Sequence, residues 1–401
     1  MRILYHHRTA SKDGQAVHIE EMIAALRGLG HEVRVIAPDI GGGHDARGKM
    51  GAHATWVHRL KDILPQALYE ILELAYSLLA YRRLAAAVRE FKPDLLYERY
   101  NLYLVTGTLV KRRFGIPVLL EVNSPLVYER SRHSGGLKLK RLAQWAEGFA
   151  WRGADRVLPV TGVLAQHVRD CGVPDKRIMV IQNGINETHF ADAPEREAAK
   201  VALHLAGQLV LGFTGFVRDW HGVDRVVRWL ASAGAPPNAQ LLIVGDGPAR
   251  AELEALSRSL GVAARVRFTG VLDRSDVPRH AAAFDVALQP AVTPYASPLK
   301  LMEYLVLGKA IVAPRVPNLQ EVLVDGDNAV LFDAAIDGAF EAALTRLCAD
   351  PDLRARLATG ARATIGRLEL TWDANARRVV ALAAALAQEL SVPSVHAKAA
   401  P

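Results

Sequence analysis

The feature that most constrains this chain is a regular alternation of short apolar segments with longer amphipathic ones. Residues 3–5 are apolar, and apolar side chains between Ile19 and Leu26 then recur at the spacing of one helix face. Residues 33–36 form the next apolar segment. This order predicts a strand, a helix and a second strand, a unit that builds parallel sheets.

The same alternation continues along the chain and restarts once. In the first half we expect helices near 60–90 and 138–152, and strands at 94–97, 117–122, 156–160 and 178–181. A polar, alanine-rich stretch at 187–207 is predicted to be a linker. Further strands are expected at 209–213, 240–244, 266–268, 286–288 and 310–313. The sequence therefore predicts two doubly wound α/β domains, over residues 1–190 and 191–372, and a last helix with a frayed tail over 373–401.

Composition excludes several classes of protein. Half of the 401 residues are hydrophobic and 23% are charged, and apolar runs stay short of a bilayer span. The two cysteines, Cys171 and Cys348, match no metal or redox spacing. We therefore exclude a membrane-spanning, disulfide-rich, fibrous or iron–sulfur protein, and we expect a cytoplasmic location, with a possible peripheral position at the inner face of the membrane.

The basic residues suggest two kinds of partner. The net charge is +7, which suits phosphate-bearing ligands or an anionic membrane as well as a generally basic surface. The stretch from Arg130 to Arg141 holds five Lys or Arg and no acid. We expect peripheral membrane contact and a lipid-linked acceptor there; the alternative is a solvated loop and helix face. The motifs of nucleic-acid binding are absent, so no nucleic-acid partner is expected.

Residues 295–309 carry the most informative motif. Ser297 is a suitable N-cap, Pro298 suits the first helical position, and Gly308 closes the helix. A helix start suits a pyrophosphate, and Lys300 in the first turn suits an anion. Glu303 lies about 9 Å along the axis from Ser297, where its carboxylate could accept hydrogen bonds from a ribose diol. The alternative is a surface helix with incidental charges.

A second motif follows an apolar strand. Gly215 and Gly222 allow close approach of the backbone, while Arg218 and His221 between them are donors suited to phosphate. A tight turn with a packing Trp220 is an equally good interpretation.

Polar residues that follow strands complete the candidates. Gly14 precedes the first helix, and the other candidates follow two apolar strands of the first half: Glu98, Arg99, Asn123 and Ser124. Ligands of open α/β sheets bind at the carboxyl ends of strands. Each of these residues could also be an ordinary loop residue.

These motifs together resemble glycosyltransferase family 4. The helix from Ser297 to Gly308, the loop from Gly215 to Gly222, and the segments 182–185 and 244–248 occur in the family's order. The resemblance implies a GT-B fold, in which two Rossmann-like domains face each other across a cleft and the final helix crosses back to the first domain. It also implies retaining transfer from a nucleotide sugar, with no required cofactor and no metal.

The resemblance also implies roles for single residues. Glu303 matches the second Glu of the family's Glu-x7-Glu motif, and Tyr295 occupies the first Glu position. Asn123 stands where many members carry His. Catalytic roles are implied for Glu303, His221 and Asn123. Donor-binding roles are implied for Gly14, Asn183, Gly215, Arg218, His221, Leu299, Lys300 and Glu303, and acceptor-binding roles for Glu98, Arg99, Asn123 and Ser124.

The expected function is therefore transfer of a sugar from a nucleoside-diphosphate sugar to a hydroxyl of a glycan or lipid-linked acceptor. Cell-surface polysaccharide or glycoconjugate synthesis is the expected setting. Two alternatives stay open: a nucleotide-sugar epimerase or phosphorylase on the same fold, and a catalytically idle nucleotide-sugar binding subunit. Tyr295 in place of the first Glu is the feature that suggests the idle subunit.

Overall fold

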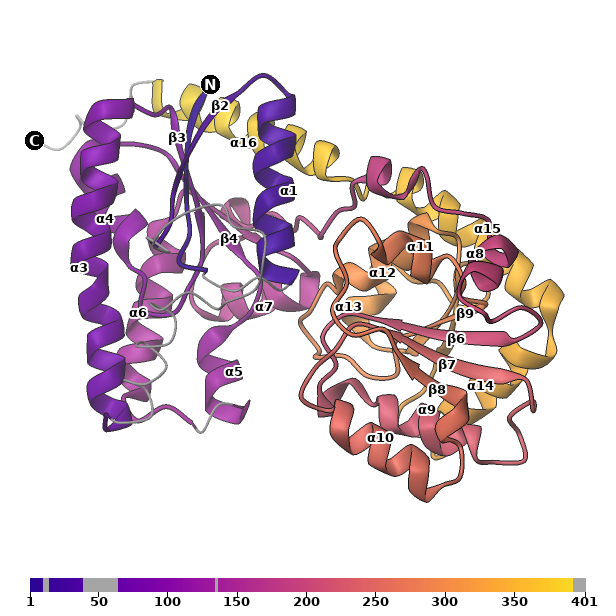
Figure 1. Ribbon diagram of the computed structural model, residues 1–401. Coiled ribbons are helices and arrows are strands. Elements are labelled where there is room, and N and C mark those ends of the chain that lie inside the picture. Colours follow the sequence, from indigo (N-terminus) through magenta and orange to yellow (C-terminus); the bar gives the residue numbers. More distant parts are fainter. Residues whose placement is uncertain (10–13, 39–63, 134–135, 392–401) are drawn as a thin grey trace, which may run out of the picture. The chain divides into compact units, whose positions relative to one another are not determined.

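The computed structural model describes residues 1–9, 14–38, 64–133 and 136–391 (Figure 1). The chain forms two compact units, an amino-terminal unit of Met1–Gln182 with Asn375–Pro401 and a carboxy-terminal unit of Asn183–Ala374. The last helix, α16 (Trp372–Ser391), therefore lies mostly within the amino-terminal unit.

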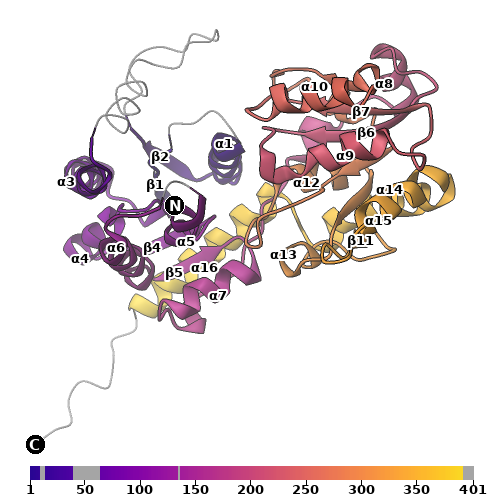
Figure 2. The same cartoon turned by 90° about the horizontal axis from the view of Figure 1, so that it is seen from below.

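The amino-terminal unit is built on a five-stranded parallel sheet of order β2-β1-β3-β4-β5. Figure 2 shows α3, α4 and α6 over one face of this sheet and α1, α7 and α16 over the other. Because helices cover both faces, β3 and β4 are buried along their whole length. The strands are β1 (Arg2–His6), β2 (Glu32–Ile36), β3 (Leu95–Arg99), β4 (Val118–Val122) and β5 (Arg156–Pro159). The helices are α1 (Gly14–Gly28), α3 (Gln66–Phe91), α4 (Thr106–Phe114), α5 (Leu126–His133), α6 (Lys140–Gly153) and α7 (Gly162–Asp170).

The carboxy-terminal unit repeats the plan with a six-stranded parallel sheet of order β11-β10-β9-β6-β7-β8. Its core lies in two layers, one on each face of the sheet, as expected when alternate residues of a buried strand point to opposite faces. The strands are β6 (Leu209–Thr214), β7 (Ala239–Val244), β8 (Val266–Phe268), β9 (Val286–Leu288), β10 (Ala310–Pro314) and β11 (Ala329–Phe332). The α-helices are α8 (Arg196–Ala202), α9 (Val223–Leu230), α10 (Arg250–Ser259), α11 (Val277–Ala281), α12 (Leu299–Val306), α13 (Pro317–Gln320), α14 (Ala339–Ala349) and α15 (Pro351–Arg367).

One predicted strand is absent, and three elements were not predicted. Residues 178–181 are not a strand: Met179 and Ile181 donate to the backbone of β5, but a single bridge at Ile178 is the only ladder contact there within the described chain. Helix α5 and strand β11 were not anticipated, and helix α8, with Ala199 and Lys200 buried, lies within the stretch predicted to be a linker. Within the described residues, no helix is long and apolar enough to cross a membrane.

Candidate active site

Helix α12 begins one residue later than predicted, and Asn183 holds its start. Pro298 occupies the N-cap position, and Ser297 does not cap the helix. Instead the Ser297 hydroxyl accepts a hydrogen bond from the Asn183 backbone N–H at 3.3 Å, and the Ser297 carbonyl accepts one from Asn183 Nδ2 at 2.7 Å. Asn183 is only 7% exposed and positions the start of α12, and its contact with a donor stays a prediction.

Glu303 is tied to the carboxyl end of β6. Its Oε2 accepts a hydrogen bond from the Thr214 hydroxyl at 2.9 Å, and the neighbouring Tyr304 hydroxyl accepts one from the Thr214 N–H at 2.9 Å. Burial raises the pKa of Glu303, against the opposing effects of Thr214, Lys300 and Arg274. A partly buried carboxyl group is thus fixed where ligands of open α/β sheets bind.

Lys300 lies beside the same strand end. Its Nζ stands 3.6 Å from the centre of the Phe213 ring, a cation–π contact. Gly215 has φ +106°, and a Cβ built on it would lie 3.9 Å from that Nζ. Burial lowers the pKa of Lys300 to about 7, although Glu303 opposes the shift. The amine is therefore poorly solvated and would gain from a bound anion.

The loop from Gly215 to Gly222 presents Arg218 and His221. The Arg218 guanidinium lies 4.9 Å from the rings of both Phe216 and Trp220, which are about half exposed. His221 Nδ1 accepts a hydrogen bond from the Arg218 N–H at 3.1 Å. Burial, with the charges of Lys300 and Arg218, lowers the pKa of His221 to about 3. A neutral ring that accepts at Nδ1 carries its proton on Nε2, so His221 is a hydrogen-bond donor there.

Two glycines of the segment 244–248 have a packing role. A Cβ on Gly245 would lie 2.2 Å from the Gly215 carbonyl oxygen, and one on Gly247 would lie 2.1 Å from that of Val217. The two loops are joined by backbone hydrogen bonds from Gly215 to Val244 and from Val217 to Asp246, each of 2.9 Å. Glycine is required at both positions because the backbone of the loop that carries Arg218 packs directly against them and leaves no room for a Cβ.

The segment before α12 has contacts that sequence reasoning missed. Tyr295, at the first motif position, is 5% exposed. Asn318 of α13 donates from Nδ2 to the carbonyls of Thr293 and Ala296, at 3.2 and 2.8 Å. Nothing in the local sequence indicates this role for Asn318, because the contact joins segments that are distant along the chain. Thr214 could have been found, since it directly follows the apolar run of β6.

In the amino-terminal unit, Glu121 contacts two of the predicted residues, Arg99 and Asn123, at the ends of β3 and β4. Its carboxylate pairs with Arg99 and with His18 Nε2 at 2.8 Å, and it accepts hydrogen bonds from Tyr97 at 2.7 Å and Asn123 Nδ2 at 2.5 Å. Burial alone would raise the pKa of Glu121, but the charges of His18 and Arg99 hold it well below its usual range. The carboxylate stays ionised and fixes its partners.

Glu98 and Arg99, which were predicted to contact an acceptor, are buried. They are 2% and 6% exposed, and Glu98 pairs with His6 at 2.6 Å. Asn123 and Ser124 are half-buried and therefore more accessible, and contact with an acceptor stays a prediction for all four residues. Gly14 begins α1, directly after the undescribed residues 10–13.

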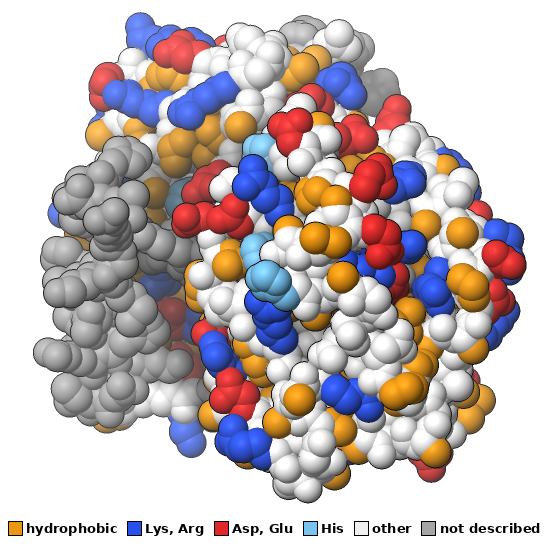
Figure 3. All heavy atoms as spheres, turned by 45° about the vertical axis from the view of Figure 1, so that its right-hand side comes forward, with side chains coloured by type: hydrophobic (Ala, Val, Ile, Leu, Met, Phe, Trp, Pro, Cys, Tyr) orange, Lys and Arg blue, Asp and Glu red, His pale blue; other side chains and the backbone are white. Residues whose placement is uncertain are grey.

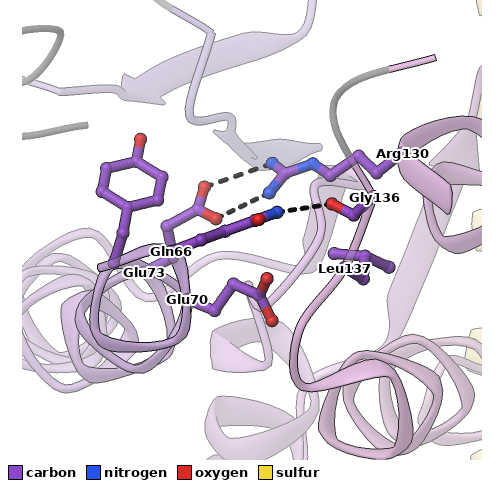
Figure 4. Close-up of a pocket in the computed structure, with 7 residues that line it drawn as sticks. Gln66, Glu70, Glu73, Arg130, Gly136 and Leu137 are labelled. Carbon is purple, nitrogen blue, oxygen red and sulfur yellow. Dashed lines mark hydrogen bonds and ion pairs between the residues drawn. The ribbon is translucent and has the colours of Figure 1, made fainter. Parts of the chain in front are cut away.

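The predicted basic stretch is not uniformly available to a partner. Arg130 donates to Glu73 from both terminal nitrogens, at 2.6 and 3.1 Å, so a carboxylate compensates its charge (Figure 4). These two residues line a pocket of about 340 Å³ with Gln66, Tyr69, Glu70, Gly136 and Leu137. On the face drawn in Figure 3, basic and acidic side chains are interspersed.

Two family models together match most of this chain. A model described as a glycosyl transferase 4-like domain matches residues 13–184, and one described as glycosyl transferases group 1 matches residues 195–364. The chain is 30% identical to a 2-deoxystreptamine N-acetyl-D-glucosaminyltransferase of Streptomyces fradiae, over 67% of this chain and 68% of the relative. It is 29% identical to the lipopolysaccharide core biosynthesis glycosyltransferase LpsE of Rhizobium meliloti, over 70% of this chain and 80% of the relative.

Solved structures share the fold. A sucrose-phosphate synthase from Thermosynechococcus elongatus superposes with a TM-score of 0.76 at 18% identity, over 97% of this chain and all of the other. Anabaena HepE in complex with UDP superposes with a TM-score of 0.71 at 19% identity, over 98% and 100%. At these identities the likeness shows the GT-B architecture of two parallel-sheet α/β domains.

Proposed function

Since this chain belongs to the group 1 glycosyltransferases and has a family 4-like amino-terminal domain, we propose that its donor is a nucleoside-diphosphate sugar. The observation that carries the proposal is the arrangement around the carboxyl end of β6. There Thr214 fixes Glu303, and Lys300 lies against Phe213 beside a side-chain-free Gly215. Anabaena HepE in complex with UDP and with UDP-glucose supports the same class of donor.

In this proposal the diphosphate lies at the start of α12. The free N–H groups of the first turn and the amine of Lys300 supply positive potential, and Arg218 and the Nε2–H of His221 add donors. Glu303 accepts hydrogen bonds from the ribose hydroxyls. These groups stabilise the charge that develops on the leaving phosphate, and we propose that they do so without a metal ion.

We propose that the transfer retains the anomeric configuration. The acceptor hydroxyl attacks on the face that the diphosphate leaves, and the leaving phosphate oxygen takes its proton. Asn123, which donates a hydrogen bond to Glu121, is proposed to contact the reacting sugar.

The acceptor is proposed to be a glycan or lipid-linked hydroxyl in cell-surface polysaccharide or glycoconjugate synthesis, at the cytoplasmic side of a membrane. The relative that supports this is LpsE, named for lipopolysaccharide core biosynthesis. Peripheral membrane contact through the stretch from Arg130 to Arg141 remains part of the proposal. Exchange of Arg132, Lys138, Lys140 and Arg141 for Gln should weaken binding to anionic liposomes, and unchanged binding would reject that contact.

Thermal-shift screening with UDP-, GDP-, ADP- and dTDP-sugars, with and without chelator, tests the donor class. A bound donor raises the melting temperature by mass action, and the shift should survive the chelator. Glu303→Ala should abolish the shift and the release of free nucleoside diphosphate. Glu252→Gln, on the exposed side of α10, is the matched control and should behave as wild type. Chelator-sensitive binding, or an unaffected Glu303→Ala variant, would contradict the proposal.

A second candidate, an idle nucleotide-sugar binding subunit, is favoured by one observation. Tyr295 puts a buried phenol where the family carries its first carboxylate. A wild-type protein that binds a nucleotide sugar but releases no nucleoside diphosphate with any acceptor would favour this candidate.

A further inference from the structure

Helix α3 has an inverted pattern of polarity in its amino-terminal half. Glu70, Glu73 and Ser77 point into the protein and are 1%, 6% and 2% exposed. On the opposite side five large apolar side chains are 43–65% exposed: Leu68, Ile71, Leu72, Leu78 and Leu79. With Ala75, also exposed, they recur every three or four residues and form one stripe over about three turns. We call these six residues the α3 stripe.

The inward polar residues explain why the leucines point outward. Glu70 accepts hydrogen bonds from the N–H groups of Lys138 and Leu139, both at 2.8 Å, and from the Tyr103 hydroxyl at 3.0 Å. Glu73 pairs with Arg130. These contacts fix the rotation of α3, because turning the stripe inward would break them and leave buried donors such as the Tyr103 hydroxyl without a partner.

An exposed apolar stripe of this size marks a surface that contacts another body. The charges on α3 and its neighbouring helices indicate which kind of partner fits this surface. Outside the Arg130–Arg141 stretch, the exposed residues of α3, α4 and α6 include six Lys or Arg, three from α3, two from α4 and one from α6. The one exposed acid of these helices, Glu90, is paired with Arg34 at 2.7 Å. Arg82 and Arg83 follow the stripe within one turn.

An exposed tryptophan lies on the same helical layer. Trp145 of α6 is 48% exposed and stacks on Phe149, with ring centres 5.3 Å apart, and the Arg112 guanidinium of α4 lies 4.7 Å from the same Phe149 ring. Apolar side chains, tryptophan and arginine together suit the boundary between lipid headgroups and acyl chains.

We propose that the α3 stripe is a docking surface for an anionic lipid bilayer, with Arg82 and Arg83 contacting the lipid phosphates. Figure 1 shows α3 along the outer edge of its unit, so the stripe can meet a flat surface. This surface is distinct from the Arg130–Arg141 stretch, in which Arg130 is already paired. It does not depend on the identity of the donor.

The test is co-sedimentation of the full chain with vesicles of phosphatidylcholine alone or mixed with phosphatidylglycerol. The wild type should bind only the anionic vesicles. The paired variant Leu78→Asn, Leu79→Asn should lose binding, and Arg82→Gln, Arg83→Gln should lower the partition coefficient roughly thirtyfold, because each cation near the surface contributes about fivefold. Val201→Asn, also 63% exposed, and Arg356→Gln are the matched controls and should bind as wild type.

Each other outcome overturns the proposal. Failure of the wild type to bind anionic vesicles shows that the stripe has another occupant. If both double variants bind anionic vesicles as strongly as the wild type, the lipid contact lies elsewhere on the protein. A concentration-dependent dimer that Leu78→Asn, Leu79→Asn dissolves shows that the occupant is a second copy. The variants change exposed residues, and an unchanged melting temperature with donor confirms that the fold and donor site are intact.

Discussion

The affinity for a nucleotide sugar should depend on pH through Lys300. Burial lowers the pKa of this amine to about 7 in the free protein. A diphosphate beside Nζ would favour the charged form and return the pKa toward the ordinary value of 10.5. The pKa is thus raised on binding, so the affinity is fully present below pH 7 and is lost as pH rises above it.

The size of the effect follows from the protonated fraction of the free protein. That fraction is about one half at pH 7 and about 3% at pH 8.5, for a pKa of about 7. Affinity should therefore fall roughly fifteenfold between these pH values, equivalent to about 1.6 kcal/mol. Binding at pH 7 should also take up about half a proton.

Isothermal titration calorimetry measures both quantities. The ligand should be the nucleotide sugar that stabilises the protein most, because its diphosphate diester does not titrate in this range. Repeating the titration in buffers of different ionisation enthalpy gives the proton uptake. Lys300→Arg is the matched control, since its charge persists at every pH used, and it should flatten the pH dependence.

Other groups near Lys300 do not produce the same signature. His221, with a pKa of about 3, remains neutral throughout. Glu303 has a raised pKa, and its ionisation also disfavours an anion, but Lys300→Arg leaves that contribution in place. Equal wild-type affinity at pH 7 and 8.5, or an Arg variant with the wild-type pH dependence, would refute the role of Lys300.

Two further predictions concern stability. Gly247→Ala would push a Cβ to 2.1 Å from the Val217 carbonyl oxygen, so urea denaturation should show a loss of about 1–3 kcal/mol, whereas Gly366→Ala, with open space around it, should cost nothing. Glu121→Gln leaves the buried Arg99 without its carboxylate and should cost about 3–5 kcal/mol at pH 7. Because the folded pKa of Glu121 is depressed, this contribution exists above the unfolded carboxyl pKa and is lost as pH falls, so wild type and variant should converge in acid. A constant difference between them down to low pH would contradict that account.

Sequence periodicity predicted the elements that are buried on both faces. Strands such as β6 and β7 are short apolar runs between helices, and their boundaries differ from the prediction by about one residue. Residues 178–181 looked the same, yet they lie at a sheet edge, with Met179 and Val180 41% and 38% exposed. A local apolar pattern cannot distinguish a full ladder from an edge segment, because that depends on which neighbours the fold supplies.

The candidate site also contains residues that the local sequence indicates and residues whose contacts depend on distant strands. Glu303, Lys300, Gly215 and His221 could be found because they lie in two continuous motifs, each next to a strand end. Glu98 and Arg99 were predicted to contact an acceptor because they follow an apolar run. Their side chains are buried because they pair with His6 and Glu121, which lie on other strands.

The fate of Asn183 shows what such contacts add to the proposed chemistry. Its two hydrogen bonds to Ser297 replace the side-chain cap that the sequence predicted for α12. With the serine hydroxyl engaged elsewhere and Pro298 at the N-cap, the first N–H groups of α12 receive no side-chain cap from that residue. Those groups are the ones that the proposal assigns to the diphosphate, so Asn183 also keeps the helix start available for it by engaging Ser297.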